Sequence, residues 1–339
     1  MRTICYIMIV IAVSWILPLY GIITKVGTTA APFLTMPVGP RALGMGGAFV
    51  SVADDATAMF WNVAGIARLT HNEAVLVHTR WFAGIAFEYA GVVLPIKRFG
   101  TIGANFTYLD IGEMEQTTEL DPEGTGVWFH CGSFAFGLSY ARPLTDRFVI
   151  GFNVKYIEER IMNCRATGFA IDIGTLFRTQ FKGTRFGMSI SNYGTKMQMT
   201  GSDLLVQHDI APDMAGNNPF INAYLATGRF DLPLLLRVGV SVDLVNTATH
   251  RLTVACDALH PNDNTESLNL GLEYVFNNVL SLRAGYKSLF MMDSEEGFTF
   301  GVGLTTSMRG VLHSMRIDYA YESFGRLSNV QNISVTTRF

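Results

Sequence analysis

The chain is poor in charge, since only 16% of its 339 residues are Asp, Glu, Lys or Arg, against roughly 25% in ordinary soluble domains. It also lacks long apolar runs: after the first two dozen residues no stretch reaches about 18, which excludes a polytopic helical membrane protein. Four cysteines, one of them at position 5, do not describe a disulfide framework. A net charge of -3 without blocks of either sign makes nucleic acid an unexpected partner.

What the sequence does have is apolar residues, which make up 49% of the chain. The first of them, from Ile4 to Tyr20, follow Arg2 and have the charged start and apolar middle of a secretory signal peptide. We therefore predict a signal peptide over residues 1–24, with the mature chain beginning between Ile22 and Ala31. The protein is expected to leave the cytoplasm.

From about residue 74 onward the apolar residues recur at every second position, which is the period of strands with two different faces. In residues 148–156, for example, Phe148, Ile150, Phe152, Val154 and Tyr156 alternate with small or polar residues. Fourteen such segments are predicted, near 74–82, 84–94, 100–110, 130–142, 147–158, 167–178, 184–193, 234–244, 250–258, 267–276, 279–288, 297–306, 313–322 and 330–339. A soluble β-sandwich also alternates, so the period alone leaves it open.

The connections between the strands favour a membrane barrel. Every second connection has six residues or fewer, for example 95–99, 277–278 and 307–312, whereas the long ones, notably 111–129 and 194–233, fall in the other set. Short turns at one end and longer loops at the other are typical of outer-membrane barrels. A closed barrel also leaves no unpaired backbone edge in lipid. We predict an all-β fold, a transmembrane antiparallel β-barrel of about fourteen strands over residues 74–339, with a long outer loop at 194–233.

The last residue adds to this interpretation. Phe339 ends the final strand on the same face as Ile333 and Val335, and such a C-terminal aromatic residue looks like the signal that the barrel insertion machinery of Gram-negative-type bacteria reads. Outer-membrane lipid and that machinery are therefore expected partners, and the bacterial outer membrane is the expected location.

Residues 25–73 do not alternate. They contain a glycine-rich turn, a short apolar stretch and two aspartates before a brief helix. The segment is too short to be a domain, and a barrel of this size is not filled by its own side chains. We therefore expect residues 25–73 to lie inside the barrel as a hatch, with Arg41 as the candidate partner of Asp54 and Asp55.

The run from Gly39 to Gly65 resembles the N-terminal signature of the PorV/PorQ family, a branch of the FadL-like outer-membrane proteins. The shared positions lie in Arg41-Ala-Leu-Gly-Met-Gly-Gly-Ala-Phe49, Ala53-Asp-Asp-Ala56 and Trp61-Asn-Val-Ala-Gly65. Val63 stands where the family usually has proline. We take as the hatch motif Arg41, Gly44, Gly46, Gly47, Asp54, Asp55, Trp61, Asn62 and Gly65. The resemblance implies a fourteen-stranded barrel with an N-terminal hatch.

No motif for catalysis, cofactor or metal binding accompanies this pattern. The glycines at 44, 46 and 47 lack the preceding strand and the lysine of a phosphate-binding loop. The seven histidines are scattered without zinc-site spacing, and no G-x-S-x-G elbow occurs. We expect a protein that is not an enzyme, with no cofactor and no metal.

Charged residues on the polar face of the strands are expected to line the lumen. The principal ones are Glu88, Asp172, Arg237, Asp243, Arg283, Arg316 and Asp318, and Asp257 and Glu273 fall on the same face. This assignment assumes that the apolar face of every strand meets lipid. Because both signs are present, the wall suits ion pairs to a hatch better than a strongly ion-selective pore.

Two functions follow from the resemblance, and a third class stays open. PorV relatives imply the handling of secreted cargo, or of secretion components, in a type IX-like pathway; FadL relatives imply the uptake of hydrophobic small molecules. A structural barrel with another partner is the third. The loop 194–233 is rich in Met and aromatic residues: it either folds over the barrel mouth as a lid or contacts a hydrophobic ligand or an exported partner.

Overall fold

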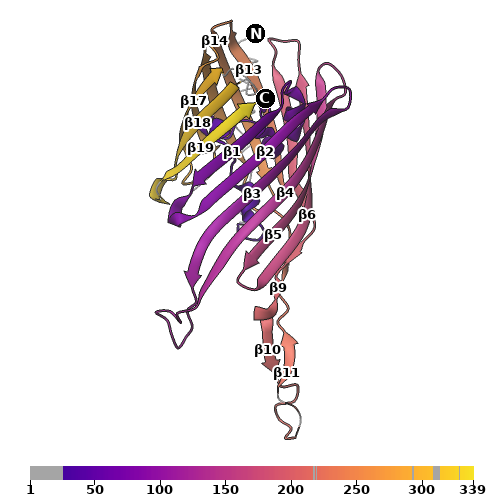
Figure 1. The fold of residues 1–339 in the computed structure, drawn as a ribbon, viewed down its shortest axis with the longest axis vertical. Coiled ribbons are helices and arrows are strands. Elements are labelled where there is room, and N and C mark those ends of the chain that lie inside the picture. Colours follow the sequence, from indigo (N-terminus) through magenta and orange to yellow (C-terminus); the bar gives the residue numbers. More distant parts are fainter. Residues whose placement is uncertain (1–25, 217, 219, 292–293, 308–313, 328) are drawn as a thin grey trace, which may run out of the picture.

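The computed structural model describes residues 26–216, 218, 220–291, 294–307, 314–327 and 329–339. The predicted signal peptide and most of the predicted turn 307–312 lie outside the described residues. Fourteen long strands form one antiparallel barrel (Figure 1). They are β1 (Glu73–Arg80), β2 (Ala86–Ile96), β3 (Gly100–Glu115), β4 (Trp128–Pro143), β5 (Phe148–Ile161), β6 (Cys164–Arg178), β7 (Arg185–Gly194), β13 (Leu235–Asn246), β14 (His250–Pro261), β15 (Ser267–Phe276), β16 (Leu280–Leu289), β17 (Phe298–Ser307), β18 (Ser314–Ser323) and β19 (Asn329–Arg338).

The predicted fold class is confirmed, because each of the fourteen expected segments is a strand of this barrel. The sheet closes where β1 pairs with β19, from Glu73↔Arg338 to Arg80↔Gln331. Strand β7 pairs with β13 across the long loop. Strands β3 and β4 run further than predicted, with pairing up to Glu115↔Trp128. A sheet closed in this way satisfies its backbone hydrogen bonds without an open edge, as a bilayer requires.

The outer surface of the barrel is apolar. Large hydrophobic side chains point outward from neighbouring strands, among them Phe136, Leu138, Phe152, Val154, Phe169, Ile171, Leu270, Leu272, Phe300 and Val302. Their alternation with buried polar residues explains the composition, since about half of each strand faces lipid and carries almost no charge.

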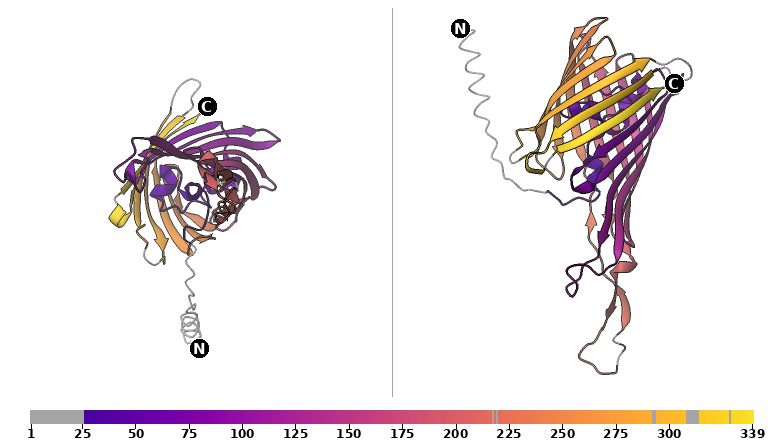
Figure 2. Two further views of the ribbon diagram at one scale, coloured as in Figure 1. Left: turned by 90° about the horizontal axis from the view of Figure 1, so that it is seen from below. Right: turned by 60° about the vertical axis from the view of Figure 1, so that its left-hand side comes forward.

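The long connections lie together at one end of the barrel, which we call the outer end (bottom of Figure 1). The loop between β7 and β13 contains β8 (Met197–Gln198), β9 (Thr200–Gly201), the 3-10 turn η4 (Ser202–Leu204), β10 (Leu205–His208), β11 (Ile221–Tyr224) and β12 (Arg229–Phe230). Strands β10 and β11 pair with each other as a hairpin. This outer hairpin projects away from the barrel (Figures 1 and 2), so the loop is not a lid over the mouth.

The segment before β1 lies inside the barrel, as expected for a hatch (Figure 2, left, indigo). It consists of the short helical elements η1 (Pro32–Thr35), α2 (Pro40–Gly44), α3 (Ala58–Trp61) and η2 (Val63–Arg68). Its apolar residues, including Val38, Met45, Phe49 and Ile66, are fully buried and form the main hydrophobic cluster of the protein. Two further 3-10 turns, η3 (Phe82–Gly84) and η5 (Gly325–Leu327), lie in connections. No helix among the described residues has the length and apolarity needed to span a membrane.

Candidate functional site in the barrel lumen

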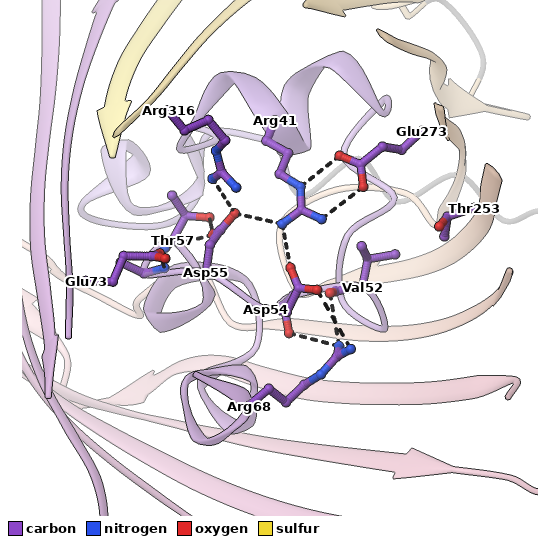
Figure 3. A network of polar contacts seen from close by, with 12 residues as sticks. Arg41, Val52, Asp54, Asp55, Thr57, Arg68, Glu73, Thr253, Glu273 and Arg316 are labelled. Carbon is purple, nitrogen blue, oxygen red and sulfur yellow. Dashed lines mark hydrogen bonds and ion pairs between the residues drawn. The ribbon is translucent and has the colours of Figure 1, made fainter. Parts of the chain in front are cut away.

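Hatch and wall meet in a ring of six side chains of alternating charge. Figure 3 shows four of them, Arg41, Asp55, Glu273 and Arg316. The Nε and Nη2 atoms of Arg41, in α2, donate to the two carboxylate oxygens of Glu273 at 2.9 Å each. The Nη1 atom of the same side chain lies 3.0 Å from Asp55 Oδ2. One hatch arginine thus joins a wall carboxylate to a hatch carboxylate through a two-point contact that fixes its orientation.

The wall completes the ring. Arg283 Nε contacts Glu273 Oε1 at 2.8 Å, and its Nη1 contacts Asp318 Oδ1 at 2.7 Å. Arg316 then lies 2.7 Å from Asp318 and 2.9 Å from Asp55 Oδ2, which returns to the hatch. Three arginines and three carboxylates therefore alternate with no net charge.

Asp54 extends the ring on its hatch side. It contacts Arg41, and its other oxygen lies 3.8 Å from Arg68, whose guanidinium also donates to the Val52 carbonyl at 3.1 Å. Burial would raise the pKa of Asp54, but the charges of Arg41 and Arg68 outweigh it and hold that pKa well below its usual range. The pKa of Asp55 is likewise lowered, by Arg316 and Arg41 against the effect of burial. Both hatch aspartates are therefore ionised.

Strand register explains how the wall assembles its part. Glu273 on β15 stands directly opposite Arg283 on β16. The side chain of Arg283 extends across β17 to Asp318 on β18. This contact requires a position on β17 that has no side chain. Gly303 supplies it: a Cβ there would lie 2.2 Å from Asp318 Oδ1 and 3.0 Å from Arg283 Nη1. A side chain at position 303 would break the ring.

The ring is buried, and its chemistry is that of a structural lock. The side chains of Glu273, Arg283 and Asp318 are at most 2% exposed. Breaking a buried pair of this kind is strongly destabilising, because it leaves an uncompensated charge in the interior. Among the described residues there is no group of three or more His, Cys, Asp or Glu side chains that could hold a metal ion.

A second set of contacts anchors the middle of the hatch. The Oδ2 atom of Asp257, on β14, accepts hydrogen bonds from the backbone N–H groups of Phe49 and Val50 at 2.7 and 2.8 Å. Arg237 lies over the rings of Phe60 and Trp61, 5.2 Å from the Trp61 ring centre. Cation–π contacts of this kind are attractive where the cation is desolvated.

The remaining motif residues shape the hatch itself. Trp61 Nε1 donates to the Val38 carbonyl at 2.8 Å, and Asn62 Nδ2 donates to the carbonyls of Val50 in the hatch and Thr175 in the wall. Gly46 has φ of +64°, and a Cβ there would lie 2.8 Å from backbone atoms of β15 and β16. Gly44, Gly47 and Gly65 also have no room for a side chain.

The wall formed by β1 to β3, which β19 separates from β18, holds the hatch mainly through apolar contacts. Val75, Val77, Phe87, Tyr89 and Val93 are buried and face inward from β1 and β2. Between these strands and the hatch lies Met59 of α3, whose side chain fits against positions 91 and 103, where both residues are glycine. This wall contributes mainly burial of apolar surface; its one charged contact with the hatch is Glu73 of β1, which accepts a hydrogen bond from the Ala56 N–H at 2.7 Å.

Glu88 was expected in the lumen, and this is wrong. Its neighbours Phe87 and Tyr89 take the inward positions of β2, so Glu88 points outward and pairs with His78 of β1 at 2.6 Å. The physical reason is that the inner face of β1 and β2 is itself apolar, because it packs on the hatch. The assumption that an apolar face always meets lipid fails here.

The other predicted residues lie apart from the ring. Asp172 contacts Lys155 at 2.9 Å and accepts a hydrogen bond from the Asn192 N–H where β7 bulges. Asp243 pairs with Arg185 at 2.7 Å. The Phe339 N–H donates to the Asn72 carbonyl at 3.1 Å, next to the start of β1.

Three anchoring residues did not stand out in the sequence. Asp257 and Glu273 fell on the polar face of their strands, but nothing in the pattern distinguished them from other polar positions. Arg68 follows the hatch motif and had no signal of its own. Only the fold brings these residues to Arg41, Phe49 and Asp54.

Solved structures resemble the chain in fold. A Pseudomonas aeruginosa FadL homologue matches with a TM-score of 0.53 and 12% identity, covering 89% of this chain and 98% of that one. The CymD monoaromatic hydrocarbon channel matches with 0.57 and 14%, covering 89% and 97%. The Ralstonia pickettii toluene transporter TbuX matches with 0.55 and 12%, covering 89% and 98%. At such identities the likeness shows the barrel fold alone.

No curated protein matches the sequence. The family model described as type IX secretion system protein PorV matches residues 23–217, more than half of the chain. That span holds the hatch motif and β10, the first strand of the outer hairpin. Family and fold together place the protein in the bacterial outer membrane. The chain belongs to the PorV family and is a FadL-like outer-membrane β-barrel.

Proposed function

We propose that this protein is a non-enzymatic component of a type IX-like secretion pathway that binds secreted cargo or another secretion component at the outer end of the barrel. The observation that carries this proposal is the outer hairpin. It presents large apolar side chains to water far from the lipid-facing belt: Ile210, Met214, Phe220, Tyr224 and Leu225 are between 56% and 70% exposed. Exposed apolar surface on a projecting element is typical of a protein interaction site.

The lumen supports the same function. The hatch is tied to β15, β16 and β18 by the charged ring and to β14 by Asp257, and its core residues are fully buried. Opening a passage through the barrel would require several of these contacts to break together. A barrel closed in this way suits a protein that works through its surface.

The test removes the outer hairpin. Residues 205–224 would be replaced by a short Gly-Ser turn, which leaves β8, β9 and β12 in place. We expect the amount of exported protein that copurifies with the barrel to fall about tenfold or more, because the apolar contact surface is lost. Secretion in cells carrying the variant should fall with it. A heat-dependent gel shift like that of the unchanged protein verifies the barrel.

Two substitution sets refine this test. Replacing Ile210, Met214, Phe220 and Tyr224 by Ser should reproduce the deletion, whereas replacing Gln207 and His208, on the same hairpin, should leave capture unchanged. Undiminished capture and secretion without the hairpin would contradict the proposal.

The alternative is uptake of small hydrophobic molecules. It is favoured by an open cavity of about 460 Å³ at the outer end, which is lined mainly by apolar side chains and falls within the size range of small-molecule sites. Uptake of radiolabelled toluene by liposomes that contain the purified protein distinguishes the two functions. Entry faster than in empty liposomes would favour the channel. A structural role with another partner predicts neither capture nor uptake.

A further inference from the structure

The cavity at the outer end combines an apolar floor with two carboxylates. Its apolar lining comes from four neighbouring segments of the chain and consists of Phe129, Ile161, Met162, Cys164 and Met199. Strand register places Ile161 opposite Cys164, so both face the same side of the wall. The polar part of the lining consists of Glu115, Gln116, Thr117 and Asp203.

Both carboxylates are held in place. Asp203 accepts hydrogen bonds from the backbone N–H and the side-chain amide of Asn163 at 3.0 and 2.9 Å, and these bonds lower the pKa of Asp203. Glu115 Oε1 accepts from the Gly126 N–H at 2.9 Å. Neither carboxylate has an ion pair with a basic side chain among the ion pairs of the described residues.

The segment that supplies Glu115 to the cavity is acidic. Residues 111–127, which comprise the end of β3 and its connection to β4, contain five acidic residues and no Lys or Arg. The nearest arginines, Arg160 and Arg165, stand opposite each other on β5 and β6. Because successive side chains of a strand alternate, they point away from the face that carries Ile161 and Cys164. Arg160 still reaches a lining residue, since its Nε donates to the Met162 carbonyl at 3.3 Å, but it has no ion pair with Glu115 or Asp203 among the ion pairs of the described residues. A cation entering the cavity therefore meets carboxylates that are not paired with a basic side chain there.

We propose that this cavity, which we call the acidic pocket, binds a basic side chain carried within an apolar segment of the exported partner. A lysine or arginine buries its aliphatic stem along apolar surface while its charged end reaches a carboxylate. Flanking apolar residues of the same segment fill the rest of the cavity. This inference rests on the proposed function, and it specifies the chemical feature of the partner that the acidic pocket recognises.

The position of the acidic pocket points to a polypeptide. Met199 and Asp203 belong to the segment that leads into the outer hairpin, so a chain bound along the hairpin passes over the pocket. Two residues before Ile161, Glu159 accepts a hydrogen bond from the Ala31 N–H of the hatch at 3.1 Å. The pocket thus lies between the hairpin and the first described residues of the hatch.

The experiment measures binding of two labelled peptides to the purified full-length protein in detergent. One is a short peptide of Val, Ile and Tyr with a central Lys; the other has norleucine, which has a similar length and no charge, in place of the Lys. We expect the Lys peptide to bind about tenfold more tightly, because a charge-assisted contact is made with little competing charge nearby. High salt should reduce this difference.

Variants locate the effect. The double substitution Glu115→Gln and Asp203→Asn should abolish the preference for Lys. Glu119→Gln with Glu123→Gln, the same change of charge in the connection between β3 and β4, should leave it. Met199→Trp fills the cavity and should weaken both peptides about tenfold. The heat-dependent gel shift verifies that each variant is a folded barrel.

Equal binding of the two peptides, or a preference that survives the double substitution, would overturn the proposal and favour a site for small apolar molecules. The proposed function fails separately. A protein that loses no cargo when the outer hairpin is removed contradicts that function, whereas a protein that captures cargo but ignores Glu115 and Asp203 contradicts only the acidic pocket.

Discussion

The two walls of the lumen hold the hatch by different forces. On β15, β16 and β18 the contacts are a closed ring of buried charges that includes Arg41 and Asp55 of the hatch. On β1, β2 and β3 they are mainly apolar, with Met59 of α3 lying against glycines 91 and 103, and one carboxylate, Glu73 of β1, accepts a hydrogen bond from the Ala56 N–H of the hatch at 2.7 Å. The hatch is thus held by ion pairs to β15 and β18 and mainly by apolar packing against β1, β2 and β3.

The difference determines what each wall contributes. Buried ion pairs are costly to desolvate, and separating the two charges leaves each of them unpaired. The charged wall therefore determines the position of the hatch. The energy of apolar contacts changes gradually when the hatch shifts, and a methionine side chain adapts its shape to irregular gaps. The apolar wall therefore supplies burial and tolerates small shifts. Substitutions of similar size should therefore destabilise the hatch much more when they lie on the charged wall than when they lie on the apolar wall.

The largest effect is expected at Glu273. Glu273→Gln removes the charge that both Arg41 and Arg283 contact, and an uncompensated buried charge typically costs about 3–5 kcal/mol. We expect the hatch to become cleavable by protease at much lower urea concentration than in the unchanged protein, and the barrel to conduct ions in planar bilayers.

The matched control is Glu266→Gln, which removes an exposed pair with His260. Such pairs contribute about 0–1 kcal/mol. The hatch should therefore stay protected from protease, and the planar bilayers should show no ion current through the barrel. If Glu273→Gln also left the hatch protected, the ring would not be what fixes its position.

A smaller effect is expected from adding one methyl group to each wall. Gly285→Ala, on the charged side, places a Cβ 2.1 Å from the backbone nitrogen of Gly46, which cannot move without shifting the hatch. Gly103→Ala, on the apolar side, places it 2.5 Å from the Met59 sulfur, which can rotate away. Overpacking should loosen the hatch by about 1–3 kcal/mol in the first case and by less than about 1 kcal/mol in the second.

The urea dependence of protease cleavage within the hatch measures both substitutions. Combining Gly103→Ala with Met59→Ala should cost less than the sum of the two single effects, because the shorter side chain makes room. Equal losses from Gly285→Ala and Gly103→Ala would contradict the contrast between the two walls.

The same contrast explains how far the sequence could be interpreted. Period-two alternation fixed the fourteen strands, and it placed Arg283, Arg316 and Asp318 inward because polar and apolar faces differ on those strands. On β1 and β2 both faces are largely apolar, so the pattern could not tell hatch from lipid, and Glu88 was assigned to the wrong side. The inward direction of such a strand depends on what fills the lumen, which is tertiary information.

Which side chains contact each other was harder still to predict from the sequence. The hatch motif suggested that Arg41 meets Asp54 and Asp55, which lie 13 and 14 residues further along the chain. Its bond to Glu273 spans 232 residues and depends on strand register and on the depth at which the hatch sits. Neither is encoded locally. The outer hairpin was visible only as an apolar loop, since four-residue strands such as β10 and β11 leave too short a pattern to recognise.

The smallest effect is expected from moderate acid. The pKa values of Asp54 and Asp55 are lowered in the folded protein, because Arg41, Arg68 and Arg316 outweigh the opposing effect of burial. A carboxylate whose pKa is lowered on folding stabilises the fold above its unfolded pKa of roughly 4 and loses that contribution only as the pH falls further. As far as Asp54 and Asp55 hold it, the hatch should therefore stay protected from protease, and the barrel closed to ions, between pH 8 and pH 5. Leak should then begin only below roughly pH 4, with the barrel itself still showing its gel shift. Hatch release on going from pH 7 to pH 5 would mean that another titrating group holds the hatch, for example Asp257, which accepts hydrogen bonds from the Phe49 and Val50 N–H groups.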